Sequence, residues 1–139
     1  MQKCIELAKK SGADIPVGAL VVRNSEILAA SHNKKEKLQQ VSAHAEILAL
    51  NEAADKLKNW RLTDCDLYVT LEPCPMCTWA ILNSGIKNVY FGANDTKYGA
   101  FGGALNLMQY NNFKTKVFSG IMEEECEQLI KEYFRNIRK

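Results

Sequence analysis

Two cysteines separated by two residues, together with a histidine 30 residues upstream, place the tightest constraint on how this chain folds. On one helical turn, Cys74 and Cys77 face the same side, so both sulfurs can bind one ion. His44 offers an imidazole as the third ligand, and Glu46 lies beside it without being needed to hold the metal. Three ligands with an open position are typical of catalytic zinc, whereas structural zinc has four ligands. We therefore expect one catalytic Zn²⁺ per chain.

A structural zinc site, or a cysteine pair without metal, is the alternative interpretation of this motif. A structural site would need a fourth ligand, and none of the remaining candidates is paired at ligand spacing: His32, Cys4, Cys65 and Cys126. Glu46 would have no role in a structural site. The motif therefore favours a catalytic centre.

Both halves of the motif are predicted to lie at helix starts. Pro75 is tolerated in a first helical turn and Gly85 ends a helix, which predicts a helix over 75–84. A second helix, running to about Lys58, is predicted from apolar residues at helical spacing: Ile47, Leu50, Ala54 and Leu57. On a regular helix His44 and Glu46 would point about 200° apart. They can share a site only if metal and water lie beyond the helix end.

Length and composition indicate one soluble globular domain over residues 1–139. The chain is 47% hydrophobic and 24% charged, with a net charge of +2, so bulk charge does not identify a nucleic-acid partner. No apolar run approaches the roughly 20 residues that span a bilayer, and the N-terminal residues do not form a signal peptide. Five cysteines, two of them claimed by the metal motif, argue for a reducing compartment. We expect a cytoplasmic protein with no membrane partner.

The remaining pattern predicts an α/β fold. We expect a short helix ending near Gly12, a hairpin of strands 19–22 and 27–30, and a polar loop over 31–40. Strands are expected at 67–71, 88–91 and 116–118, with a glycine-rich loop over 92–103 and a short helix near 106–109. The last helix carries one apolar stripe from Met122 to Ile137. Alternation of strands and helices predicts a three-layer α/β/α sandwich with a mixed central sheet of about five strands.

The same residues carry a family resemblance. His-x-Glu followed by Pro-Cys-x-x-Cys is the established signature of zinc-dependent nucleobase deaminases. The chain resembles the cytidine deaminase-like superfamily, and within it the bacterial tRNA-specific adenosine deaminases. The zinc motif is shared with deaminases of cytosine, guanine and cytidine. The resemblance to the tRNA enzymes extends over nearly the whole chain, in segments 16–19, 43–46, 60–62, 67–77, 91–100 and 134–135.

The resemblance implies hydrolysis of adenosine to inosine at the wobble position of a tRNA anticodon loop, with Glu46 as the proton shuttle. It implies that Asn33 hydrogen-bonds the purine, that the backbone around Ala45 orients the attacked group, and that Val17 and Leu71 line the pocket. For Val17, a place in the ordinary core is an equal alternative. The family also implies a homodimer. The partner would be a tRNA anticodon stem-loop and not DNA.

Contacts to the RNA are expected from charged residues in the second half of the chain. Asp95 would accept a hydrogen bond from a ribose 2′-hydroxyl, which DNA lacks. The candidates for contacts to the RNA backbone are Lys97, Arg135 and Arg138. For the two arginines, a plain interaction with the negative end of their own helix is the alternative.

Three features depart from the family pattern. The first helix is short, Tyr98 and Phe101 place aromatic rings where relatives usually have smaller residues, and Gly103 stands where relatives often have serine. Two other functions stay open from the sequence. One is a deaminase of a free base or nucleoside, and the other is a non-catalytic zinc domain that binds RNA.

Overall fold

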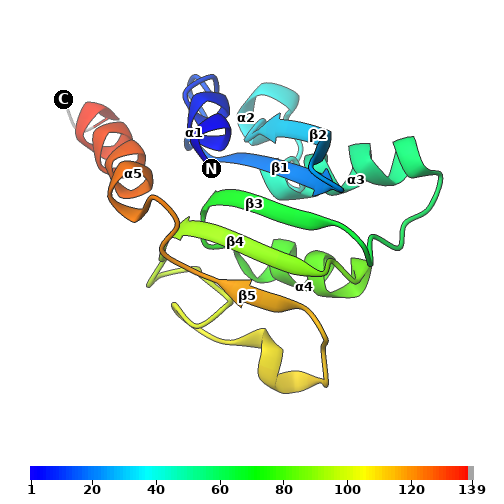
Figure 1. Ribbon diagram of the computed structural model, residues 1–139. Coiled ribbons are helices and arrows are strands. Elements are labelled where there is room, and N and C mark those ends of the chain that lie inside the picture. Colours follow the sequence, from blue (N-terminus) through cyan, green and yellow to red (C-terminus); the bar gives the residue numbers. More distant parts are fainter. Residues whose placement is uncertain (138–139) are drawn as a thin grey trace.

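The computed structural model describes residues 1–137 and is built on one mixed sheet of five strands. The strands run in the spatial order β2 (Glu26–His32), β1 (Gly18–Arg23), β3 (Asp66–Leu71), β4 (Asn88–Ala93) and β5 (Lys116–Phe118) (Figure 1). β1 is antiparallel to both β2 and β3, whereas β3, β4 and β5 are parallel. The predicted mixed sheet is confirmed.

Helices cover both faces of this sheet and complete the predicted three layers. α3 (Ala45–Leu57) and α4 (Pro75–Ser84) pack on one face, where they share the main apolar core with Val21, Val69 and Val89. α1 (Gln2–Ala8) and α5 (Glu123–Ile137) pack on the opposite face around a smaller cluster that contains Ile5 and Cys126. α4 lies behind the parallel strands in Figure 1, and α5 lies near the carboxyl ends of β3 and β4.

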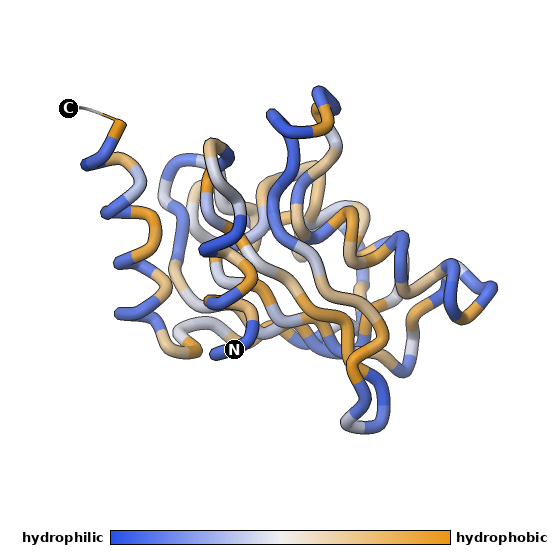
Figure 2. The backbone as a smooth tube through the Cα atoms, turned by 90° about the horizontal axis from the view of Figure 1, so that it is seen from above, coloured by the Kyte–Doolittle hydropathy of each residue, from blue (hydrophilic) through white to orange (hydrophobic). Residues whose placement is uncertain are grey.

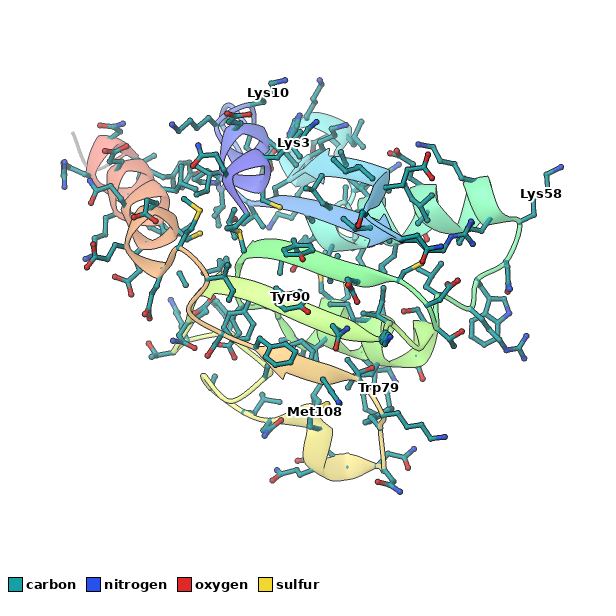
Figure 3. The ribbon with its side chains drawn as sticks, viewed as in Figure 1. Lys3, Lys10, Lys58, Trp79, Tyr90 and Met108 are labelled. Carbon is teal, nitrogen blue, oxygen red and sulfur yellow. The ribbon has the colours of Figure 1, made fainter. Side chains whose placement is uncertain are left out.

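An aromatic row crosses the parallel strands on the face that carries α1 and α5. Tyr68, Tyr90 and Phe118 are in register on β3, β4 and β5. Their rings stack with centroid distances of 4.7 Å and 5.1 Å. Tyr90 lies on the near side of the sheet in Figure 3, where no helix covers it. Cross-strand aromatic pairs of this kind add to the stability of the pairing.

The segment between β2 and α3 differs from the predicted polar loop. β2 continues to His32, and a short helix, α2 (Lys35–Leu38), follows. The reason is a distant cap: Asp14 accepts hydrogen bonds from the backbone N–H groups of Glu36 (2.7 Å) and Lys37 (3.3 Å). Because Asp14 is far away in sequence, local pattern could not reveal this helix. The predicted helix near 106–109 is present as a 3₁₀ turn, η1 (Leu107–Tyr110).

The apolar stripe of α5 is only partly used. Cys126 and Leu129 are buried, but Phe134 is 37% exposed and Ile137 is 59% exposed. Figure 2 shows α5 at one side of the molecule with hydrophobic and hydrophilic positions alternating along it. The helix therefore docks through its N-terminal half. Within residues 1–137, no helix combines the length and apolarity needed to cross a membrane.

Candidate active site

Two helix starts bring the three predicted metal ligands together. His44 has an extended backbone (φ −77°, ψ 151°) and is the N-cap of α3, so it precedes the helix while Glu46 lies in the first turn. Cys74 is the N-cap of α4, and Cys77 follows in that helix's first turn. This placement removes the angular conflict expected for His44 and Glu46 on one regular helix. Both side chains reach a common space beyond the end of α3.

The distances within this group fit a tetrahedral zinc ion. His44 Nδ1 lies 3.7 Å from Cys74 Sγ and 3.5 Å from Cys77 Sγ. The three ligand atoms all lie within 4.8 Å of one another. Ideal tetrahedral coordination, with Zn–S of about 2.3 Å and Zn–N of about 2.1 Å, separates sulfur and nitrogen ligands by about 3.6 Å. These three residues therefore form a zinc-binding set.

Protonation of the two cysteines also suits a metal. A hydrogen bond from Cys77, with a second from His44, lowers the pKa of Cys74 to about 4. The same interaction with Cys74, together with burial, raises the pKa of Cys77. The hydrogen bond to Cys74 also raises the pKa of His44. The pair holds one proton between two sulfurs, and a divalent cation that displaces this proton binds both as thiolates.

Glu46 has the properties of a proton-transfer group. Its side chain is only 4% exposed, and burial raises its pKa to about 7. A carboxyl group with this pKa both accepts and releases a proton near neutral pH. Within residues 1–137, the metal-binding group consists of these three ligands, and no other histidine, cysteine, aspartate or glutamate supplies a fourth. The arrangement is that of a catalytic rather than a structural zinc site.

A cavity of about 490 Å³ opens in front of this group. His44, Glu46 and Cys74 line it, and Leu71 contributes an apolar wall. Val17 also lines the cavity and at the same time belongs to the main core. The volume falls in the range of roughly 300–1,000 Å³ that is typical of pockets for small ligands.

Asn33 presents an unused acceptor to the cavity. Its Nδ2 donates to the Ile15 carbonyl at 3.2 Å, which fixes the orientation of the amide. Its Oδ1 is buried and, within residues 1–137, has no hydrogen-bond partner. An unpaired buried acceptor is costly, so this atom is suited to a donor on a bound ligand. Ala45, by contrast, is fully buried in the main core at the first position of α3.

The loop over 94–103 forms one wall of the cavity and is held from beneath by Glu72. This buried carboxylate accepts hydrogen bonds from the backbone N–H groups of Asp95 (3.0 Å), Phe101 (3.0 Å) and Gly103 (2.8 Å). A Cβ atom at Gly99 or Gly103 would come within 2.5 Å of Glu72 Oε1. The loop therefore excludes side chains at these two positions, which explains why Gly103 is not a serine here.

The candidate RNA contacts lie at different distances from this centre. Asp95 lines the cavity, while Lys97 is exposed on the same loop. Arg135 is exposed on α5, where it lines a separate groove with Ile130 and Phe134. Arg138 lies outside the described residues. Sequence reasoning missed Glu72, and it also missed two other residues of the cavity wall, Asp14 and Tyr133.

The comparisons with known proteins agree with this geometry. The model of the MafB19-like deaminase family matches residues 1–138. The chain is 45% identical to the tRNA-specific adenosine deaminase of Bacillus subtilis, over all of this chain and 89% of that protein. It is 41% identical to the tRNA-specific adenosine deaminase of Rickettsia felis, over 90% of each chain.

Solved structures of deaminases share this fold. A tRNA:A34 deaminase, from work on A-to-I editing at the wobble position of transfer RNA, superposes with a TM-score of 0.86 at 35% identity, over 93% of this chain and 96% of that chain. A guanine deaminase from Nitrosomonas europaea superposes with a TM-score of 0.81 at 26% identity, over 95% of this chain and 81% of that chain. With His44, Cys74 and Glu46 lining one cavity, and Cys77 completing the metal-binding group, the chain belongs to the family of tRNA-specific adenosine deaminases.

Proposed function

We propose that this protein hydrolyses adenosine to inosine at the wobble position of a tRNA anticodon loop. The observation that carries the proposal is the buried carboxyl group of Glu46, with its pKa of about 7, in the same cavity as two of the metal ligands, His44 and Cys74. The relatives named above support the choice of substrate. In the reaction, water adds to the purine carbon that bears the amino group, and ammonia leaves.

The residues of the cavity divide the chemistry among them. His44, Cys74 and Cys77 would hold a zinc ion, whose Lewis acidity would lower the pKa of water toward neutrality. Glu46 takes a proton from the attacking water and delivers protons to the purine ring and to the leaving ammonia. Asn33 Oδ1 accepts a hydrogen bond from the purine. The first backbone N–H groups of α3, around Ala45, orient the attacked group.

The substrate has to come from a single-stranded segment. A base stacked in a duplex cannot reach a carboxyl group as deeply buried as Glu46, so the adenosine must turn out of a loop. Asp95 Oδ1 already accepts two backbone N–H groups, from Lys97 and Tyr98, at 3.0 Å each. Its second oxygen remains for a ribose 2′-hydroxyl, which favours RNA over DNA. Lys97 and Arg135, both exposed, contact phosphates.

We further propose that the protein acts as a homodimer in the cytoplasm. Met76 and Trp79 are exposed apolar residues three positions apart on α4, so they share one face of the helix that carries Cys77. Trp79 projects from α4 in Figure 3, and its ring meets Phe113 edge-on at 5.6 Å. Burying such a surface against a second copy is favourable. The thiolate ligands need a reducing compartment, which agrees with the cytoplasm.

The test is to incubate the zinc-loaded protein with an anticodon stem-loop that carries a wobble adenosine. Free adenosine, cytidine and guanine are the controls. We expect inosine in the RNA only, and turnover of a free base instead would establish the alternative function. Glu46→Gln should keep zinc and lower kcat by roughly 10²- to 10⁴-fold. Glu52→Gln, on the exposed side of the same helix, is the matched control. Near-normal turnover by Glu46→Gln would refute the role of Glu46.

A further inference from the structure

Tyr98 is an exposed aromatic residue at the rim of the catalytic cavity. It lines the same cavity as His44 and Glu46, yet its side chain is 58% exposed. The other tyrosine of the lining, Tyr133, is already engaged, since its hydroxyl donates to the Ala13 carbonyl at 3.0 Å and its ring packs against Phe134. The exposed ring of Tyr98 is therefore accessible to a ligand in the cavity.

The backbone beneath Tyr98 is held firmly. Asp95 Oδ1 accepts the N–H of Tyr98, and the N–H of Gly99 donates to the Asp95 carbonyl at 2.9 Å. The buried carboxylate of Glu72 fixes the N–H groups of Asp95 and Phe101 on either side. An aromatic ring on a loop with these constraints loses little entropy when a ligand binds, because its backbone is already ordered.

The charge around the ring suits a nucleic acid. The Lys97 ammonium lies 5.3 Å from the centroid of the Tyr98 ring, within the range of a cation–π contact. A phosphate can pair with this ammonium while a base lies on the aromatic ring. Stacking on aromatic side chains is the usual way in which proteins hold unpaired bases beside a nucleotide that is splayed out of a loop.

We propose that Tyr98 is a recognition residue that stacks on a base next to the adenosine undergoing deamination. This inference rests on the proposed function and adds a second contact to it. One adenosine occupies the cavity at the zinc ligands, and the adjacent nucleotide of the loop lies on the Tyr98 ring. The protein thereby selects a single-stranded oligonucleotide over a free nucleoside, which has no neighbouring base to stack.

The experiment compares wild type, Tyr98→Ala and Tyr98→Phe, all zinc-loaded, on three RNA hairpins. One hairpin is intact, and the others lack the base on the 5′ or the 3′ side of the target adenosine. On the intact hairpin, Tyr98→Ala should lower kcat/KM by roughly 5- to 150-fold, the range for loss of one stacked base. The decrease should come from a higher KM with kcat unchanged, because the stacking contact contributes the same energy in the ground state and the transition state. Tyr98→Phe should keep near-normal values.

The abasic hairpins make the test specific. Removing the stacked base should lower the kcat/KM of wild type by a similar factor. It should cause almost no additional decrease in the kcat/KM of Tyr98→Ala. Tyr110→Ala removes a ring that is 67% exposed and outside the cavity, and serves as the control. If Tyr98→Ala lowers kcat/KM equally on all three hairpins, or not at all, the stacking role is refuted. Turnover of the intact hairpin by wild type would still support the proposed deaminase function. No wild-type turnover on the intact hairpin would instead overturn the proposed function.

A second measurement detects stacking of the neighbouring base on Tyr98 independently of turnover. 2-Aminopurine replaces the neighbouring base in the hairpin, and its fluorescence falls when it stacks on an aromatic ring. Wild type and Tyr98→Phe should quench this fluorescence on binding, and Tyr98→Ala should not. Equal quenching by all three proteins would contradict the proposal.

Discussion

Replacement of Glu72 by glutamine tests how the cavity wall is held. The carboxylate is buried and accepts three backbone N–H groups, one at Oε1 and two at Oε2. A glutamine can place its single carbonyl oxygen at the Oε2 position and keep the bonds to Phe101 and Gly103. Its amide NH₂ then faces the N–H of Asp95, so this backbone N–H loses its acceptor.

The magnitude follows from these three contacts. A buried donor left without an acceptor costs about 1–3 kcal/mol. The two retained bonds lose their charge-assisted character, which is worth about 1 kcal/mol in total after the lower desolvation of a neutral side chain is counted. We expect Glu72→Gln to lower the free energy of unfolding by about 2–4 kcal/mol. That is a large part of the roughly 5–15 kcal/mol of a typical domain.

The assay has a global and a local readout. Denaturant unfolding of Glu72→Gln gives the change in free energy, and Glu124→Gln, an exposed carboxylate on α5, is the control. Hydrogen exchange should show faster exchange at the amides of Asp95, Phe101 and Gly103 and unchanged exchange in α3. A loss below about 0.5 kcal/mol, the usual range of surface substitutions, with these three amides still protected would refute the reasoning.

Three further predictions concern the metal, the RNA and the dimer. In protein stripped of metal, iodoacetamide should label Cys74 at nearly the same rate at pH 6 and pH 8, because its pKa of about 4 lies below both. A tenfold rise per pH unit would contradict this. Burial raises the pKa of the three cysteines outside the metal site to about 11 or 12, so they should stay unlabelled in the folded protein. These are Cys4, Cys65 and Cys126. Arg135→Ala should reduce the salt dependence of RNA binding by about one unit of slope with kcat unchanged, and an unchanged slope would return Arg135 to a helix-end role. Trp79→Glu should shift the proposed dimer toward monomer in sedimentation, whereas a dimer of unaltered mass would place the interface elsewhere.

Local sequence signals were sufficient for most elements of the fold. Pro75 at the first position of α4 and Gly85 after its end define that helix, and the structure has it over Pro75–Ser84 as predicted. The alternating strands around it gave the mixed sheet. The metal ligands were also predictable, because residue types and spacing specify them.

Long-range contacts account for what could not be predicted. α2 depends on the cap from Asp14, and the cavity wall depends on Glu72, whose three partners lie 23 to 31 residues away. A charged residue at the junction of a buried strand and a metal motif, followed by closely spaced glycines, is a signal that could have pointed to Glu72. The stripe on α5 predicted a helix but not its partner, so the exposure of Phe134 and Ile137 could not be foreseen.

Because the metal ligands His44 and Cys74 occupy the N-cap positions of α3 and α4, these two helices are less stable than they could be. Neither side chain makes a capping hydrogen bond to its helix. An aspartate or serine at an N-cap usually adds about 1 kcal/mol, so each of the two helices begins without a stabilisation that the fold could otherwise have. Without zinc, His44→Ser should therefore melt at a higher temperature than wild type, and with zinc the order should reverse, since the variant lacks the imidazole ligand and gains less stability from the metal. Selection for a more stable helix start at either position would remove the ion on which catalysis depends.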